Sequence, residues 1–199
     1  VALAEQRQQA RSDKDFALSD QLRADIRSAG WMVLDTADGF TLTQAPPFDS
    51  VPNVGGLPQS GATATRPLGI ALVIDGWPDD TRTCIQALLD HSPEDAVILA
   101  LDLGNVDGAG VVVHELAKAH PDRIEEFHVD APLTSTGWSA ARNALIAADT
   151  SEFHVVMDLS SVLEGDAFTP LVEMLTADES LTASGWRGVN VDVADQWRS

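Results

Sequence analysis

The central part of the chain alternates between short apolar runs and segments with helical periodicity. The run at 96–101, Ala-Val-Ile-Leu-Ala-Leu, has no polar alternation. Such a run is typical of a strand that is buried on both faces of a parallel sheet. The same pattern predicts further strands at 68–74, 124–129 and 153–157, and helices at 79–89, 110–119, 139–148 and 167–176. Strands that alternate with helices predict an α/β fold with a mostly parallel sheet and helices on both faces.

The residues that follow the run at 96–101 are candidates for ligand binding. Asp102 takes the last strand position, and Gly104, Asn105 and Asp107 follow in the loop. Ligands of parallel sheets bind at the carboxyl ends of the strands, where such residues can hydrogen-bond the ribose or base of a nucleotide. An equal alternative is a strand-to-helix loop whose Asp and Asn side chains cap the next helix.

The first 44 residues show a different pattern. Apolar residues recur at helical spacing over 18–26, with Asp15 placed to cap the start of a helix and Gly30 to end it. The preceding segment LAEQRQQAR predicts a shorter helix, so the two helices form an antiparallel hairpin. Apolar residues on both sides of a Gly-containing turn at 35–39 predict a small β-hairpin.

A stretch rich in proline and glycine separates these two regions. Residues 43–66 hold four prolines and three glycines without periodicity, which is typical of an extended, mobile linker. We therefore expect a module at 1–44, a linker at 45–66 and a second module at 67–199. Because the sequence begins with Val1 and ends without any tail signal, we expect a fragment whose second module is incomplete at its C-terminus.

Composition narrows the functional classes. The 31 acidic and 12 basic residues give a formal net charge of -19, which disfavours broad binding to nucleic-acid backbones. No apolar stretch reaches the ~20 residues that span a bilayer, and the N-terminus is too polar for a signal peptide. The single cysteine, Cys84, fits a reducing compartment, so we expect a cytoplasmic protein.

The N-terminal segment resembles a known family. Over residues 5–42, the order of the groups AR, KDFA, AD, IR, G and DT is similar to the C-terminal end of cysteinyl-tRNA synthetases. That end lies near the tRNA anticodon stem-loop, so the resemblance implies tRNA as a partner. The residues that would face phosphates are Arg7, Arg11, Lys14 and Arg23. Residues 1–44 hold five basic and seven acidic side chains, however, so a structural or docking role is at least as good an interpretation.

Four motifs in the central region resemble, in order, the nucleotide-side motifs of family-two glycosyltransferases of the GT-A type. They are PLGIALVIDGW, AVILALDLGNVDGAG, GWSAARNALIAA and FHVVMDLSSVLEGDAF, which together cover about residues 67–186. The resemblance implies a nucleotide-diphospho-sugar transferase-like sheet, a nucleotide-sugar donor and an unknown acceptor. It implies that Asp75 and Asp102 hold the base and ribose, that Arg142 and Asn143 lie beside the donor, and that Asp158 binds Mg²⁺ or Mn²⁺ on the diphosphate.

The sequence departs from this family at two places. Where the family has Asp-x-Asp, this chain has Asp158-Leu-Ser160, which leaves one carboxylate for a hard cation. The loop after the first strand carries Trp77, which either stacks on a base or covers the sheet edge. The interpretations are therefore a glycosyltransferase, which we favour, or a nucleotide-binding or scaffold domain that has lost metal-assisted chemistry.

The sequence offers few other catalytic candidates. The five histidines, His91, His114, His120, His128 and His154, show no metal-ligand spacing, and we expect none of them to be catalytic. A serine hydrolase is excluded because the chain has no G-x-S-x-G motif. The late acids Asp192 and Asp195 are the candidates for the general base of a sugar transfer, and no motif favours either.

Overall fold

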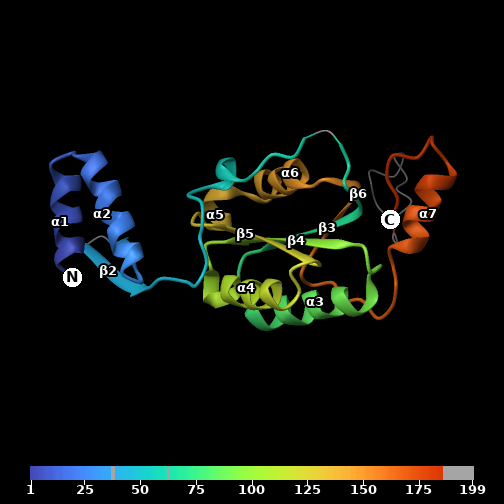
Figure 1. The fold of residues 1–199 in the computed structure, drawn as a ribbon, viewed down its shortest axis with the longest axis horizontal. Coiled ribbons are helices and arrows are strands. Elements are labelled where there is room, and N and C mark those ends of the chain that lie inside the picture. Colours follow the sequence, from blue (N-terminus) through green and yellow to red (C-terminus); the bar gives the residue numbers. More distant parts are fainter. Residues whose placement is uncertain (37–38, 62, 186–199) are drawn as a thin grey trace, which may run out of the picture. The chain divides into compact units, whose positions relative to one another are not determined.

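The chain forms two compact units, which are described separately below. The computed structural model describes residues 1–36, 39–61 and 63–185. Unit 1 is Val1–Asp49, and unit 2 begins at Ser50 (Figure 1). Within the described ranges, every helix is too short or too polar to cross a lipid bilayer.

Unit 1 consists of a helical hairpin and a β-hairpin, as predicted. Its elements are α1 (Ala2–Ser12), α2 (Phe16–Ser28), β1 (Trp31–Thr36) and β2 (Gly39–Gln44). The Asp15 side chain accepts a hydrogen bond from the Leu18 amide and so caps α2, and Gly30 ends the helix with a φ of 81°. The strands pair antiparallel, and Val33 joins Ala4 of α1 and Ile26 of α2 in a small apolar core.

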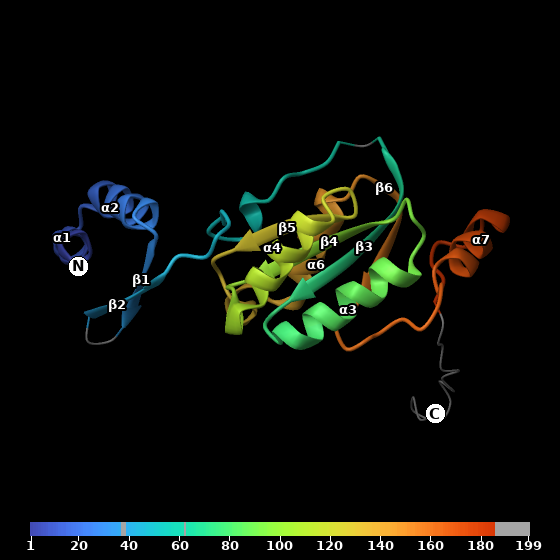
Figure 2. The same cartoon turned by 60° about the horizontal axis from the view of Figure 1, so that its bottom comes forward.

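Unit 2 contains the parallel sheet that the apolar runs predict. Its strands are β3 (Arg66–Ile74), β4 (Val97–Leu103), β5 (Ile124–Val129) and β6 (Ser151–Met157), paired in parallel in the order β5-β4-β3-β6. The helices are α3 (Pro78–His91), α4 (Ala109–Ala119), α5 (Leu133–Thr136), α6 (Trp138–Ala148) and α7 (Thr169–Ala177), with short 3-10 turns η1 (Val54–Gly56) and η2 (Val106–Gly108). Figure 2 shows β4 and β3 in the middle of this sheet.

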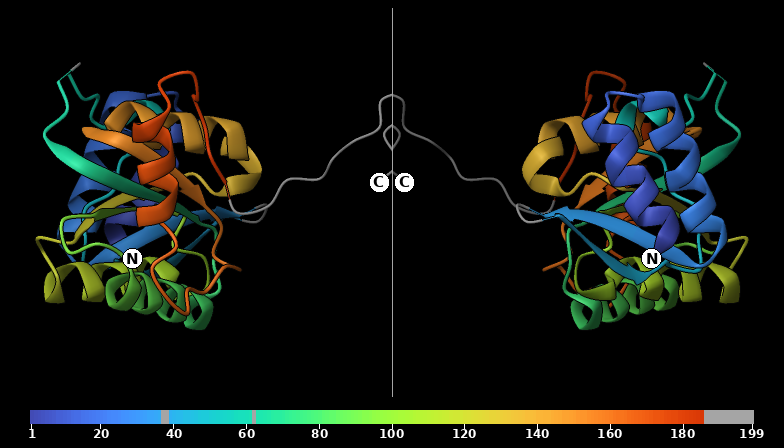
Figure 3. Two further views of the ribbon diagram at one scale, coloured as in Figure 1. Left: turned by 90° about the vertical axis from the view of Figure 1, so that its right-hand side faces the viewer. Right: turned by 90° about the vertical axis from the view of Figure 1, so that its left-hand side faces the viewer.

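Helices cover both faces of the sheet, and each face has its own core. Alternate side chains such as Ile70 and Ile98 pack with α3 and α4, whereas Ala71 and Leu99 pack with α6. The views in Figure 3 show α3 and α4 on the side of the strands opposite α6. Central strands with both faces buried explain why β3 and β4 read as continuous apolar runs.

The proline-rich stretch differs from a free extended linker. Residues 50–61, here called the strap, are hydrogen-bonded along unit 2. The Val51 amide donates to the His128 carbonyl, and the Val51 carbonyl accepts from the Asp130 amide, at 2.9 and 2.8 Å. The Ser60 hydroxyl donates to the Ala147 carbonyl, and Leu57 is buried in the core below α6. The composition of this stretch indicates that it forms no regular helix or strand. It cannot predict these hydrogen bonds to residues far away in the sequence.

Candidate functional site

The strand order of unit 2 creates a topological switch point between β3 and β6. The chain passes from β3 to β4 and β5 through α3 and α4, and then returns to the other side of β3 through α6. The loop after β3 leads into α3, and the segment after β6 also packs on the α3 side, where the Ser161 carbonyl accepts a hydrogen bond from the Cys84 thiol. The carboxyl ends of strands beside such a switch point are the usual place for a ligand. A pocket of about 380 Å³ lies there, lined by Val73, Asp75, Trp77, Asp80, Trp138, Asp158, Leu159 and Ser160.

The loop after β3 supplies one wall of this pocket. Gly76 has a φ of 129°, and Trp77, which immediately precedes α3, adopts a left-handed conformation with φ 60° and ψ 61°. This conformation is strained for a residue with a large side chain. Trp77 is 66% exposed, so its apolar surface is available to a ligand.

The opposite wall comes from α6 and the segment after β6. The Arg142 guanidinium lies over the Trp138 ring at 5.2 Å from its centroid, and its Nη2 is 3.9 Å from Asp158 Oδ2. Among the described residues, Arg142 Nε is buried without a hydrogen-bond partner. Ser160 donates from its amide and hydroxyl to Asp158 Oδ1, at 3.1 and 3.0 Å. Ser160 thus orients the carboxylate.

Charge in this pocket is unbalanced. Three carboxylates, of Asp75, Asp80 and Asp158, line it, with one guanidinium, that of Arg142, next to Asp158. A phosphate group would be repelled here unless a cation offset the negative charge. Oxygen ligands suit Mg²⁺ or Mn²⁺, but one carboxylate at the expected position leaves most coordination sites to water and phosphate oxygens.

Asp102, which the glycosyltransferase resemblance places on the nucleotide, lies outside this pocket. Its side chain is 1% exposed and is absent from the residues that line the pocket. Every second side chain of a strand points to the same face of the sheet, so Asp102 shares a face with Ile98 and Ala100. That face is covered by α3 and α4. Its carboxylate accepts from the Asn105 amide and contacts His128 Nδ1, both at 3.0 Å.

The other predicted nucleotide residues, Gly104, Asn105, Asp107 and Asn143, do not line the pocket. Gly104, Asn105 and Asp107 form the loop after β4, and all three have positive φ, from 46° to 85°. Asn143 is exposed on α6, next to Arg142. The structure thus brings Asp75, Trp77 and Asp158 together, with Arg142 at the rim.

Sequence reasoning missed a second polar cluster, formed by His114, Glu126 and His128. His114 lies on α4, and the other two lie on β5. Their ligand-type atoms all lie within 4.8 Å of one another, so the described residues contain a group able to hold a metal ion. The signal was Glu-x-His in a predicted strand, because two residues apart on a strand share a face. His114 has no fixed sequence spacing to that pair, since a helix-to-strand crossing brings it in.

Cys84 and a second pocket carry less chemistry. Burial, followed by the neighbouring Asp158 charge, raises the pKa of the Cys84 thiol to about 11, so the thiol stays protonated and is a weak nucleophile.

A larger pocket of about 540 Å³ between β6 and α7 is lined mainly by apolar side chains, such as Phe153 and Leu171. Asp192 and Asp195 lie outside the described residues.

In unit 1, the predicted tRNA-contact residues divide into two pairs. Arg7 is 6% exposed and donates from Nη1 and Nη2 to the two Asp35 carboxylate oxygens, at 2.7 and 3.1 Å. Arg11 also pairs with Asp35. Lys14 and Arg23 are exposed. Half of the predicted cationic set therefore serves an internal ion-pair cluster.

Fold and site together define unit 2 as a doubly wound α/β domain with a ligand-sized crevice at its switch point. No family model matches the chain. A cysteine-tRNA ligase of Opitutus terrae is 52% identical over 45 residues, which is 23% of this chain and 10% of that protein. This match supports the resemblance of the N-terminal segment to the C-terminal end of such ligases. The match does not extend to the glycosyltransferase resemblance, which rests on the order of sequence motifs alone.

Proposed function

We propose that unit 2 binds the nucleotide part of a nucleoside diphosphate sugar in the pocket between β3 and β6, as a glycosyltransferase of the GT-A type. The observation that carries this proposal is the pocket itself, at the carboxyl ends of the strands that flank the switch point. A catalytically inactive domain that binds the same nucleotide is the second form of the proposal, favoured by Ser160 in the position of the family's second aspartate.

The pocket residues suit distinct parts of such a ligand. The exposed Trp77 ring offers a face for base stacking, and the Asp75 carboxylate can accept from ribose hydroxyls. Arg142, whose partly exposed guanidinium has its Nη2 3.9 Å from Asp158 Oδ2, suits a phosphate oxygen. Asp158 would share a divalent cation with the diphosphate, so cation and nucleotide would bind interdependently. Asp102 receives no ligand contact in this proposal, because it is buried and bonded to His128.

Calorimetric titration of the whole chain with UDP, GDP and their sugars, with and without Mn²⁺, tests the proposal. We expect binding that requires Mn²⁺, a loss of binding in Asp158→Asn, and tighter binding in Ser160→Asp because a second carboxylate is restored. Asp122→Asn is the matched control, since Asp122 is exposed before β5 at the opposite end of the sheet.

Two results would contradict the nucleotide proposal. One is no binding with Mn²⁺ even in Ser160→Asp, and the other is an equal loss in Asp158→Asn and Asp122→Asn. Release of free sugar or transfer to an added acceptor separates an active enzyme from an inactive binding domain.

A second proposal concerns unit 1, because its relative is a cysteine-tRNA ligase. We propose that unit 1 contacts tRNA through Lys14 and Arg23, which are exposed, and not through Arg7, which is buried against Asp35. Filter binding of tRNA at low and high salt tests this, with Lys14→Ala/Arg23→Ala as the variant. Binding that is absent at low salt would exclude tRNA as the partner and leave a docking role.

A further inference from the structure

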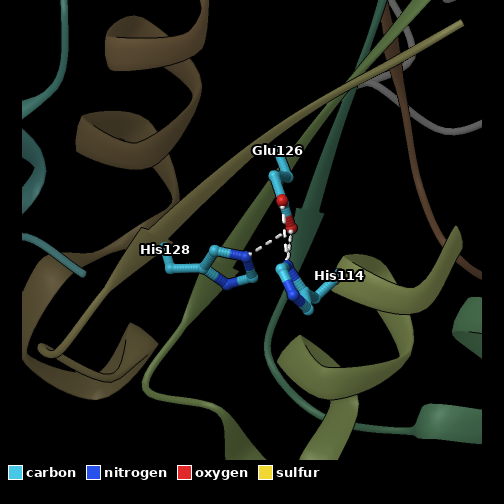
Figure 4. Close-up of side chains that lie close together, drawn as sticks. All are labelled: His114, Glu126 and His128. Carbon is cyan, nitrogen blue, oxygen red and sulfur yellow. Dashed lines mark hydrogen bonds and ion pairs between the residues drawn. The ribbon is translucent and has the colours of Figure 1, made fainter. Parts of the chain in front are cut away.

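The cluster of His114, Glu126 and His128 is built from two elements that face each other (Figure 4). Glu126 and His128 project from the same face of the edge strand β5, and His114 reaches them from α4. His114 Nδ1 lies 3.0 Å from Glu126 Oε1, and His128 Nε2 lies 2.8 Å from Glu126 Oε2. Two imidazole nitrogens and a carboxylate therefore converge on one point.

We propose that these three side chains form a binding site for a divalent transition-metal ion, with Zn²⁺ as the best match. Two histidines and one carboxylate are a ligand set that zinc sites use when one coordination position stays open. Imidazole nitrogen favours Zn²⁺ and related first-row ions over Mg²⁺, which prefers oxygen ligands. The site is therefore chemically distinct from the carboxylate pocket between β3 and β6.

Asp102 completes the arrangement behind His128. Its Oδ2 lies 3.0 Å from His128 Nδ1, and both side chains are nearly inaccessible, at 1% and 3% exposure. A carboxylate on one ring nitrogen holds that nitrogen protonated and presents the other, Nε2, as a metal ligand. The structure thus gives Asp102 a positioning role in place of the nucleotide contact that its sequence position indicated.

The accessibility of the site suits an exchangeable ion. His114 and Glu126 are 17% and 26% exposed, so solvent and ions reach the cluster from their side, while His128 is fixed by burial. Zinc–nitrogen bonds of about 2.0–2.1 Å in a tetrahedron separate the ligand atoms by roughly 3.3 Å. The ligand atoms here all lie within 4.8 Å of one another, so modest rotations of His114 and Glu126 bring them to these separations.

The same residues without a metal form a hydrogen-bonded cluster that ties α4 to β5, and the experiment must separate these two roles. We would dialyse the whole chain against chelator, titrate it with Zn²⁺ by calorimetry and record the visible spectrum after adding Co²⁺. We expect one Zn²⁺ per chain, a Co²⁺ d–d spectrum with nitrogen ligation, and a higher thermal midpoint with Zn²⁺.

Variants test each ligand without removing the buried histidine. We expect His114→Ala and Glu126→Gln each to weaken Zn²⁺ binding at least about tenfold, and Asp102→Asn to weaken it about 10- to 100-fold through His128. His91→Ala, at the end of α3, is the matched control and should bind as the unaltered chain does. Circular dichroism verifies that each variant is folded.

Two outcomes would overturn the metal site. The first is an unaltered chain that takes up no Zn²⁺ and gives no Co²⁺ spectrum. The second is a His114→Ala variant that is folded and binds Zn²⁺ as tightly as His91→Ala does.

Discussion

At the scale of single residues, Gly69 on β3 lies where an added side chain would collide with its neighbours. A Cβ at this position would lie 2.3 Å from Asp149 Oδ2 and 2.6 Å from Ser151 Oγ. Burial alone would raise the pKa of Asp149, but hydrogen bonds from His154 and Ser151 outweigh it and hold the pKa below its ordinary value. The charged Asp149, bonded to His154 Nδ1 at 2.6 Å, therefore occupies the space beside Gly69.

We predict that Gly69→Ala lowers the free energy of unfolding of unit 2 by about 1–3 kcal/mol, because the new methyl group displaces a bonded carboxylate. Chemical denaturation followed by circular dichroism measures this change. Gly165→Ala is the matched control, since a Cβ there meets no atom within 4 Å. Equal stability of the two variants would show that the Asp149 segment moves aside without cost.

At the scale of elements, Asp35 joins α1 to the β-hairpin of unit 1. It lies on β1 and accepts from Arg7 and Arg11, both on α1. Hydrogen bonding and charge from Arg7, with a smaller contribution from Arg11, lower the pKa of Asp35 against the opposing effect of burial. The carboxylate form is thus favoured by folding.

Because the pKa of Asp35 is lower in the folded state, its ion pairs stabilise the fold fully at pH values above its ordinary pKa of 3.8. This stabilisation is lost as the pH falls below 3.8 and through the pKa of the folded state. We predict that α1 and β1 open in this acid range, and that Asp35→Asn flattens the dependence. Neutral-pH stability in that variant should fall by about 1–2 kcal/mol. Hydrogen–deuterium exchange, corrected for intrinsic rates, localises the change. Asp20→Asn, exposed on α2, should leave it intact.

The helices and strands were largely predictable from the sequence, whereas the contacts between their side chains were not. Apolar runs and caps such as Asp15 act locally, so the order of helices and strands follows from the sequence. Side chains on a strand alternate in direction, so Asp102 shares a face with Ile98 and Ala100, but a run without polar alternation does not indicate which helices cover that face. The contact between His114 and Glu126 depends on how α4 packs across β5. The burial of Arg7 depends on its ion pair with Asp35. Such contacts join residues far apart in the sequence and leave no local pattern.

At the scale of the whole molecule, the boundary between the two units lies near the start of the predicted linker at 45–66. The units divide after Asp49, and the strap at 50–61 is hydrogen-bonded to unit 2. Within residues 1–61, we predict that limited proteolysis cuts between 44 and 50 first and leaves the strap attached to unit 2. Mass spectrometry of the fragments checks this. Early cuts within 51–61 would show that the strap leaves unit 2 readily.

The pairing of Val51 with Val129 has a consequence for how the protein behaves at high concentration. β5 is an outer strand, and its free backbone groups would otherwise offer a template for strands of other molecules. The bond from the Val51 amide to the His128 carbonyl occupies part of that template. A protein shortened to begin at residue 66 would keep every strand of the sheet and yet self-associate more readily than one that begins at residue 50.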